Sequence, residues 1–223
     1  MDAEPFRLSG TVYGTLLNHR TALAAFEGKM TLPPYNAPPR APVLYLKPRN
    51  TLAAGGDTVE VPAAGPGATA ELETAACLGI VIGRTACNLS EAVALDHVAG
   101  FLIVNDVSIP HPDYYRPSVR YKARDGFCPL GPRVTARALV ANPDALAIRT
   151  HVDGVLVQTM STADLIRSVA RLLADVTEFM TLAPGDVLAA GAAAPAPRVR
   201  AGQTVAMEAD ALGVLTNRFA GGT

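Results

Sequence analysis

Segment 105–133, NDVSIPHPDYYRPSVRYKARDGFCPLGPR, contains the side chains whose types and spacing could do chemistry. An apolar run ends at Asp106, and the segment then supplies Lys122, Arg124 and Asp125. A carboxylate beside a lysine and an Arg-Asp pair suits the binding of a small anionic substrate. The alternative is a loop that surface salt bridges hold in place without any ligand. We favour the functional interpretation, because a long, charged loop that is also rich in Tyr and Val is usually ordered and functional.

Core strands are expected on the N-terminal side of this segment, where they would hold its side chains in place. ACLGIVIG at 76–83 is a nearly continuous apolar run, which is typical of a buried central strand. FLIVND at 101–106 indicates a second core strand. Between them, Ser90 is positioned to cap a helix over 91–99 that ends at Gly100.

The remaining elements are further strands and one strongly amphipathic helix. Asp153-Gly154 predicts the two-residue turn of a hairpin within 146–160. Thr162 is a candidate cap for the next helix, whose apolar face is expected to comprise Leu165, Ile166, Val169, Leu172, Leu173, Val176, Phe179 and Met180. Strands are also predicted over 10–17, 43–47, 58–62 and 204–219, with a short helix or loop over 18–30. Together these elements predict one mixed, mainly antiparallel α+β domain over residues 1–223.

The composition restricts the class of protein. The chain has 223 residues, of which 49% are hydrophobic, and a net charge of −1. This balance argues against a sequence-independent nucleic-acid binder, and no apolar run approaches the roughly 20 residues of a membrane span. The cysteines Cys77, Cys87 and Cys128 have neither disulfide nor zinc spacing. We therefore expect a cytoplasmic protein without nucleic-acid or membrane partners.

Several stretches of the chain resemble the fumarylacetoacetate hydrolase (FAH) family, in the same order and at compatible spacings. They are LNHR at 17–20, LYLKPRNTL at 44–52, and the segments 78–108, 114–132, 161–166 and 178–191. Together they cover most of the chain. Segment 114–132 is most similar to the branch that decarboxylates and isomerises intermediates of homoprotocatechuate (4-hydroxyphenylacetate) breakdown. In that branch the enzyme is a tandem two-domain chain or two separate subunits, and this chain has the length of one half.

The resemblance implies a mixed-sheet β-roll, usually dimeric, whose active site holds Mg²⁺ or Mn²⁺. Expected substrates are 5-oxopent-3-ene-1,2,5-tricarboxylate and 2-hydroxyhepta-2,4-diene-1,7-dioate, whose conversion passes through an enolate that a divalent cation stabilises. The resemblance implies that Asp106 is a metal ligand and that Lys122 is the catalytic lysine, holding a substrate carboxylate. It implies substrate-binding roles for Arg124, Asp125 and His111.

The sequence departs from the family pattern at the metal site. Two family glutamates complete the metal site with Asp106, and their positions correspond to Ala75 and Cys77 here. A Glu-x-Glu pair does occur, at Glu71 and Glu73, but it lies four residues earlier. Four residues of strand span about 13 Å, so we do not expect this pair to reach the metal position.

Other family positions have also lost their polar side chains. A histidine and a glutamate on the family's lid helix correspond to Ala22 and Ala25, and the family's substrate loop reads Gly191-Ala192-Ala193 without its hydroxyl. These changes put metal binding by this chain in question. The chain is predicted to be a decarboxylase/isomerase subunit or, alternatively, a non-catalytic partner, as a homodimer or in a heteromer with a metal-bearing sister FAH subunit. An acylpyruvate-type C–C hydrolase ranks last, because no His/Glu dyad is present to activate water.

Overall fold

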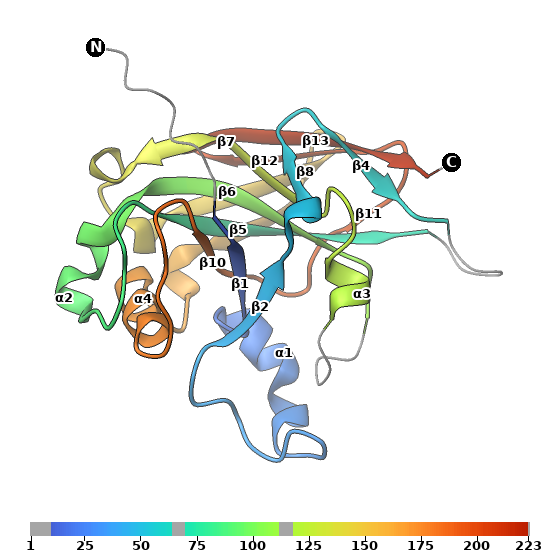
Figure 1. Cartoon of the computed structure of the whole chain (residues 1–223). Coiled ribbons are helices and arrows are strands. Elements are labelled where there is room, and N and C mark those ends of the chain that lie inside the picture. Colours follow the sequence, from blue (N-terminus) through green and yellow to red (C-terminus); the bar gives the residue numbers. More distant parts are fainter. Residues whose placement is uncertain (1–9, 64–69, 112–117, 223) are drawn as a thin grey trace, which may run out of the picture.

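Two β-sheets form the body of the computed structural model, which describes residues 10–63, 70–111 and 118–222 (Figure 1). The strands of the first sheet are β1 (Val12–Leu16), β2 (Val43–Lys47), β3 (Leu52–Ala54), β5 (Leu72–Ile82), β6 (Val98–Ser108), β7 (Cys128–Ala136), β10 (Val187–Ala192) and β11 (Arg198–Val199). Their order is β2-β1-β10-β5-β6-β7-β3, and β11 also pairs with β5. The pairs β1–β10 and β3–β7 are parallel, and the other pairs in this sheet are antiparallel.

The second sheet contains β4 (Thr58–Val61), β8 (Ala147–Val152), β9 (Val155–Ser161), β12 (Thr204–Ala209) and β13 (Gly213–Gly221). The order is β4-β13-β12-β8-β9, and only the β4–β13 pair is parallel among these described strands. Asp153 and Gly154 join β8 to β9 with positive φ angles of 50° and 81°, as a two-residue hairpin turn requires. The prediction of a mixed, mainly antiparallel α+β fold is confirmed.

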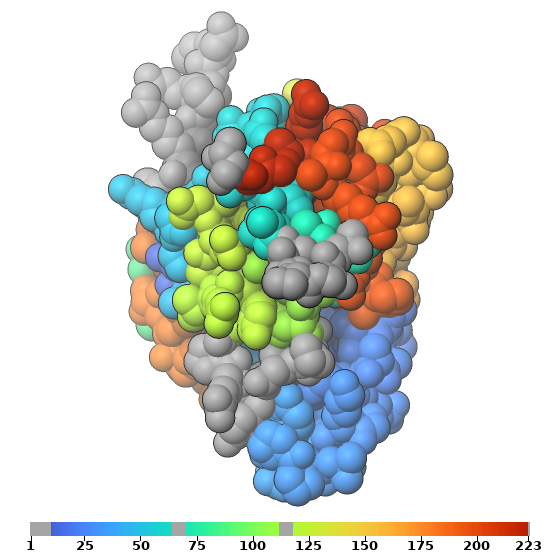
Figure 2. All heavy atoms as spheres, turned by 90° about the vertical axis from the view of Figure 1, so that its right-hand side faces the viewer, coloured from blue at the N-terminus to red at the C-terminus, as the bar shows by residue number. Residues whose placement is uncertain are grey.

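The described residues contain four α-helices, namely α1 (Arg20–Met30), α2 (Glu91–Ala94), α3 (Val119–Lys122) and α4 (Val169–Thr177). His19 caps the start of α1, and its side chain accepts a hydrogen bond from the backbone N–H of Thr21. It lies below β1 and β2 in Figure 1, while α3 lies at the right of that view. Seen from that side, the segment carrying α3 lies above the segment carrying α1 (Figure 2). None of these helices is long and apolar enough to cross a membrane.

Strands β5 and β6 form the centre of the first sheet, where sequence analysis predicted two core strands. Both are longer than predicted, so Asp106 lies inside β6 rather than at its end. The antiparallel register places Ala75 directly opposite Asp106, and their side chains therefore share one face of the sheet. The main hydrophobic core includes Phe101 of β6 and Leu172 of α4.

The helix predicted over 91–99 is shorter than expected. Helix α2 ends at Ala94, a 3₁₀ turn covers Leu95–His97, and β6 already begins at Val98. The reason is that Val98 pairs with Ile82 across the β5–β6 ladder. Val98 and Ala99, which the local pattern predicted to be helical, are therefore part of a paired strand.

The helix predicted to follow Thr162 also begins later. Thr162 starts a 3₁₀ turn, and α4 begins at Val169 with the Ser168 side chain as its cap. The intervening backbone is held by Asn18, whose C=O accepts from the Ile166 N–H and whose Oδ1 accepts from the Arg167 N–H. These long-range hydrogen bonds keep the segment out of the helix.

Two residues assigned to the apolar face of this helix are exposed as a result. The exposed fractions of Ile166 and Phe179 are 44% and 60%, whereas Leu172 is fully buried. We predict that Leu172→Ala lowers the free energy of unfolding by about 2–5 kcal/mol, because it leaves a cavity in the core. The exposed control Phe179→Ala should cost less than about 1 kcal/mol although it removes a larger side chain. Urea denaturation measures both, and equal losses would contradict this core boundary.

Candidate functional site

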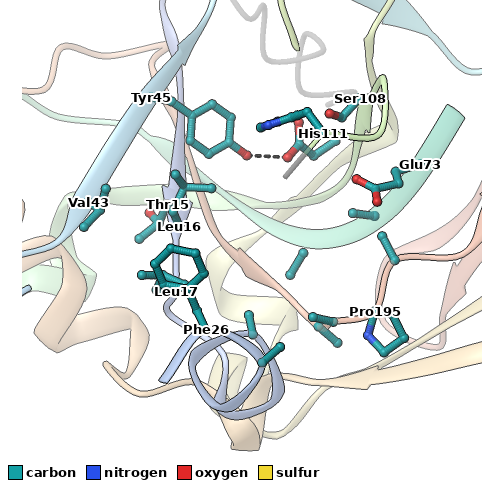
Figure 3. A pocket seen from close by; sticks show the side chains of 18 of the residues that line it. Thr15, Leu16, Leu17, Phe26, Val43, Tyr45, Glu73, Ser108, His111 and Pro195 are labelled. Carbon is teal, nitrogen blue, oxygen red and sulfur yellow. Dashed lines mark hydrogen bonds between the residues drawn. The ribbon is translucent and has the colours of Figure 1, made fainter. Parts of the chain in front are cut away.

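A cavity of about 570 Å³ lies beside α1 and the Asp106 region of β6. In Figure 3, Val43 and Tyr45 of β2 lie on one side, Glu73 of β5 lies on the opposite side, and Phe26 of α1 lies below. Most of the wall is apolar or small; these residues include Leu16, Leu17, Phe26, Met30, Val43, Ala75, Ala192, Ala193 and Pro195. A few polar groups in a mainly apolar cavity of this size are typical of a small-molecule site.

The Asp106 carboxylate, 5% exposed, is the most highly connected charge in this wall. Its Oδ2 accepts hydrogen bonds from the Tyr45 hydroxyl at 2.5 Å and from Lys122 Nζ at 2.6 Å. Burial alone would raise the pKa of Asp106, but the positive charges of Lys122 and Lys47 outweigh it and lower this pKa. Burial and the same carboxylate raise the pKa of Tyr45, so Tyr45 is a neutral phenol that donates.

Lys47, which is 2% exposed, connects three segments of backbone through one ammonium group. Its Nζ donates to the carbonyl oxygens of Val107 at 2.8 Å, Lys122 at 3.0 Å and Phe127 at 2.8 Å. An ammonium has three N–H donors, and the carbonyls use all of them. The 2.7 Å approach of Lys47 Nζ to Asp106 Oδ1 is therefore an ion contact, and Oδ1 has no aligned donor among the described residues.

Lys122 ends α3 and is the buried ammonium group that lines the cavity; the exposed Lys29 of α1 lines it as well. Its exposed fraction is 8%, and its Nζ lies 4.8 Å from the centre of the Tyr45 ring. In the part of the chain that the structure describes, Asp106 is its only hydrogen-bond acceptor. Two of its three N–H donors are thus unused by described residues.

The predicted substrate-binding residues separate in the structure. His111 is buried, lines the cavity and stacks on Tyr121 with ring centres 4.5 Å apart. Arg124 and Asp125 are exposed and do not line the cavity. The Asp125 carboxylate instead accepts a hydrogen bond of 2.7 Å from Asn50 Nδ2. Of these three residues, His111 alone lines the cavity together with Asp106 and Lys122.

The described residues around Asp106 lack the further oxygen ligands that a divalent cation requires. Ala75 faces Asp106 across the ladder and has no donor atom. Cys77 is packed among core residues that include Val104, and burial raises the pKa of its thiol, which stays protonated. Within residues 10–63, 70–111 and 118–222, no three His, Cys, Asp or Glu side chains come together as a metal would require. The donor set therefore does not fit Mg²⁺ or Mn²⁺.

The earlier glutamate pair is engaged elsewhere. Glu73 does line the cavity, but its carboxylate lies 3.1 Å from Arg198 Nη2. Glu71 accepts a hydrogen bond of 2.8 Å from Arg200 Nε. Both arginines lie at or beside β11, which pairs with the start of β5. Each of the two glutamate carboxylates is thus paired with an arginine.

The other alanine replacements also line this cavity. Ala22 and Ala25 face it from α1, and Ala192 and Ala193 face it from the end of β10. The alanines at positions that are polar in the family pattern thus gather around one cavity, whereas Cys77 packs in the core. Their common effect is to make its walls apolar.

Lys47 and Tyr45 were missed as site residues by the sequence analysis. One feature of the sequence could have pointed to Lys47. The chain has only three lysines, Lys29, Lys47 and Lys122, and its other basic residues are arginines. Two of these three lysines meet at one carboxylate. A lysine that ends the apolar strand 43–47 could therefore have been flagged as buried.

We predict that Lys47→Met lowers the free energy of unfolding by about 3–5 kcal/mol, because three buried carbonyls lose a hydrogen-bond donor and Asp106 loses one of its two positive charges. Lys122→Met should cost less, since Asp106 keeps Lys47 and Tyr45. The third lysine, Lys29, is exposed, and Lys29→Met should change stability by less than about 0.5 kcal/mol. Urea denaturation ranks the three variants, and a Lys47→Met loss no larger than that of Lys122→Met would disprove the role of Lys47.

Comparisons with known proteins identify the family. The sequence profile described as fumarylacetoacetate (FAA) hydrolase C-terminal matches residues 11–220. A 4-hydroxyphenylacetate degradation bifunctional isomerase/decarboxylase from Salmonella dublin is 37% identical over 210 residues, which cover 94% of this chain and 47% of that protein. The chain thus spans about half the length of this and two further bifunctional relatives.

Solved structures share the fold. A 5-carboxymethyl-2-hydroxymuconate delta-isomerase from Mycobacterium smegmatis superposes with a TM-score of 0.81 at 28% identity, covering 97% of this chain and 81% of that one. A maleylpyruvate hydrolase from Sphingobium sp. SYK-6, solved with manganese and pyruvate, gives a TM-score of 0.79 at 26% identity, with coverage of 98% and 72%. The chain belongs to the fumarylacetoacetate hydrolase family of enzymes.

Proposed function

We propose that this chain is one unit of an isomerase/decarboxylase that binds small unsaturated oxo-dicarboxylates or oxo-tricarboxylates at Lys122. The observation that carries the proposal is the buried Lys122 ammonium, with two N–H donors unused by described residues, in the wall of a largely apolar cavity. The relatives named for isomerisation and decarboxylation support the same class of substrate. The candidates are 5-oxopent-3-ene-1,2,5-tricarboxylate and 2-hydroxyhepta-2,4-diene-1,7-dioate.

The residues present have clear parts in such a reaction. The Lys122 ammonium holds a substrate carboxylate and places positive charge beside an oxygen that becomes more negative as an enolate forms. Asp106 accepts a hydrogen bond from this ammonium and Tyr45 contacts it through its ring, so both hold it in position. Phe26 and Met30 exclude water from the cavity, which strengthens the attraction between the ammonium and the substrate.

A second candidate function follows from Ala75 and Cys77, where the implied metal ligands are missing. In this alternative the chain is a non-catalytic partner, and a sister FAH unit that carries the glutamate pair performs the chemistry. The half-length match to the bifunctional relatives is compatible with such an arrangement. A homodimer of this chain would instead have to act through the residues described above.

We predict that the purified chain converts at least one of the two candidate substrates, and that Lys122→Gln lowers kcat/KM by about 10- to 100-fold through the lost charged hydrogen bond. Arg120→Gln is the matched control, because it removes the same charge from the same helix at an exposed position outside the cavity. Ultraviolet spectroscopy of the conjugated substrates measures turnover.

The assay separates the two candidates. Activity that appears only after a glutamate-bearing sister unit is added would favour the partner role. A Lys122→Gln variant as active as Arg120→Gln would contradict the proposed position of the substrate.

A further inference from the structure

We propose that the ammonium groups of Lys47 and Lys122 take the electrostatic place of the divalent cation in this cavity. The cavity is then a metal-independent site for the carboxylate of a 2-oxo acid. The inference rests on the proposed function for the class of ligand, but it does not require turnover.

The charges around Asp106 favour an anion over a cation. One carboxylate meets two ammonium groups at 2.6 and 2.7 Å, so the cluster carries −1 + 2 = +1. A divalent cation would bring further positive charge to a single carboxylate whose strongest interactions are already taken. A bound carboxylate would bring the cluster to zero, which is the balance that buried charges require.

The two ammonium groups have different parts in this site. Lys47 is fixed by three backbone carbonyls and cannot turn toward a ligand without losing them. It is a positioning residue that supplies charge and holds Asp106. Lys122 faces the cavity with the two N–H groups that no described residue uses, so it is the group that contacts the carboxylate.

The other described charges that line the cavity neither cancel nor duplicate this buried charge. Glu73 and Arg198 also line it, but they form an ion pair with each other and together contribute no net charge. Lys29 lines the cavity too, but it is exposed to solvent, which screens its charge. The buried surplus of +1 at Lys122 is thus the feature that an anion meets inside the cavity.

Pyruvate is a suitable probe, because it is the smallest 2-oxo carboxylate, and calorimetry measures its binding to the full chain. With EDTA present, we expect pyruvate to bind with the same affinity as in Mn²⁺. We expect Lys122→Gln to weaken binding by about tenfold or more, while Arg120→Gln changes it by less than about threefold.

Asp106→Asn gives opposite results for the two kinds of site. It removes the carboxylate that competes for the Lys122 ammonium, so an anion site should bind pyruvate about tenfold tighter or more. A metal site would lose a ligand and bind pyruvate more weakly. Circular dichroism checks the fold of this variant, because it leaves two buried ammonium groups without their counterion.

Ala75→Glu is a second variant that keeps the test decisive. It adds a carboxylate opposite Asp106 and lowers the cluster to zero. We expect it to weaken pyruvate binding in EDTA by about tenfold or more. At a metal site the same change would add an oxygen ligand and strengthen the binding of pyruvate in Mn²⁺.

The outcomes separate this inference from the proposed function. Pyruvate that binds only when Mn²⁺ is present would overturn the metal-independent site and leave the proposed enzyme standing. Pyruvate that binds in EDTA, with neither candidate substrate converted, would uphold the site and count against the enzyme. Absence of binding both in EDTA and in Mn²⁺ would overturn the inference.

Discussion

The buried ammonium of Lys47 is the group on which the rest of the site depends. It lies on β2, yet it satisfies carbonyl oxygens 60 to 80 residues away on β6, on α3 and just before β7. Buried carbonyls without a donor are costly, so this one group holds in place the backbone that presents Lys122. The same ammonium supplies half of the positive charge at Asp106. Lys47 therefore determines both the local backbone structure and the electrostatics of the cavity.

Beside Lys47 and Lys122, Asp106 has a role that its family position as a metal ligand does not suggest. Two buried ammonium groups without a counterion would be strongly destabilising, so the carboxylate is required whether or not a metal is present. An aspartate at a metal-ligand position is therefore not evidence of a metal unless its neighbours are oxygen donors too. Here those neighbours are Ala75 and a protonated thiol at Cys77.

The features that the sequence predicted correctly are those governed by local pattern. The core strands near 76–83 and 101–106 follow from continuous apolar runs, and the hairpin follows from Asp153-Gly154. The start of α4 could not be predicted, because Asn18 fixes the preceding backbone from far along the chain. The same holds for Lys47, whose partners are all distant in sequence.

The replacements around the cavity form a consistent physical set. Ala22, Ala25, Ala75 and Ala192 remove polar groups from its walls, and the lysine–aspartate cluster is left as its buried charge. Removing polar groups lowers the local dielectric, and a lower dielectric strengthens the attraction between an ammonium and a carboxylate. The alanines therefore surround the surplus of one positive charge with apolar walls, and this is the environment in which the proposed anion site would be strongest.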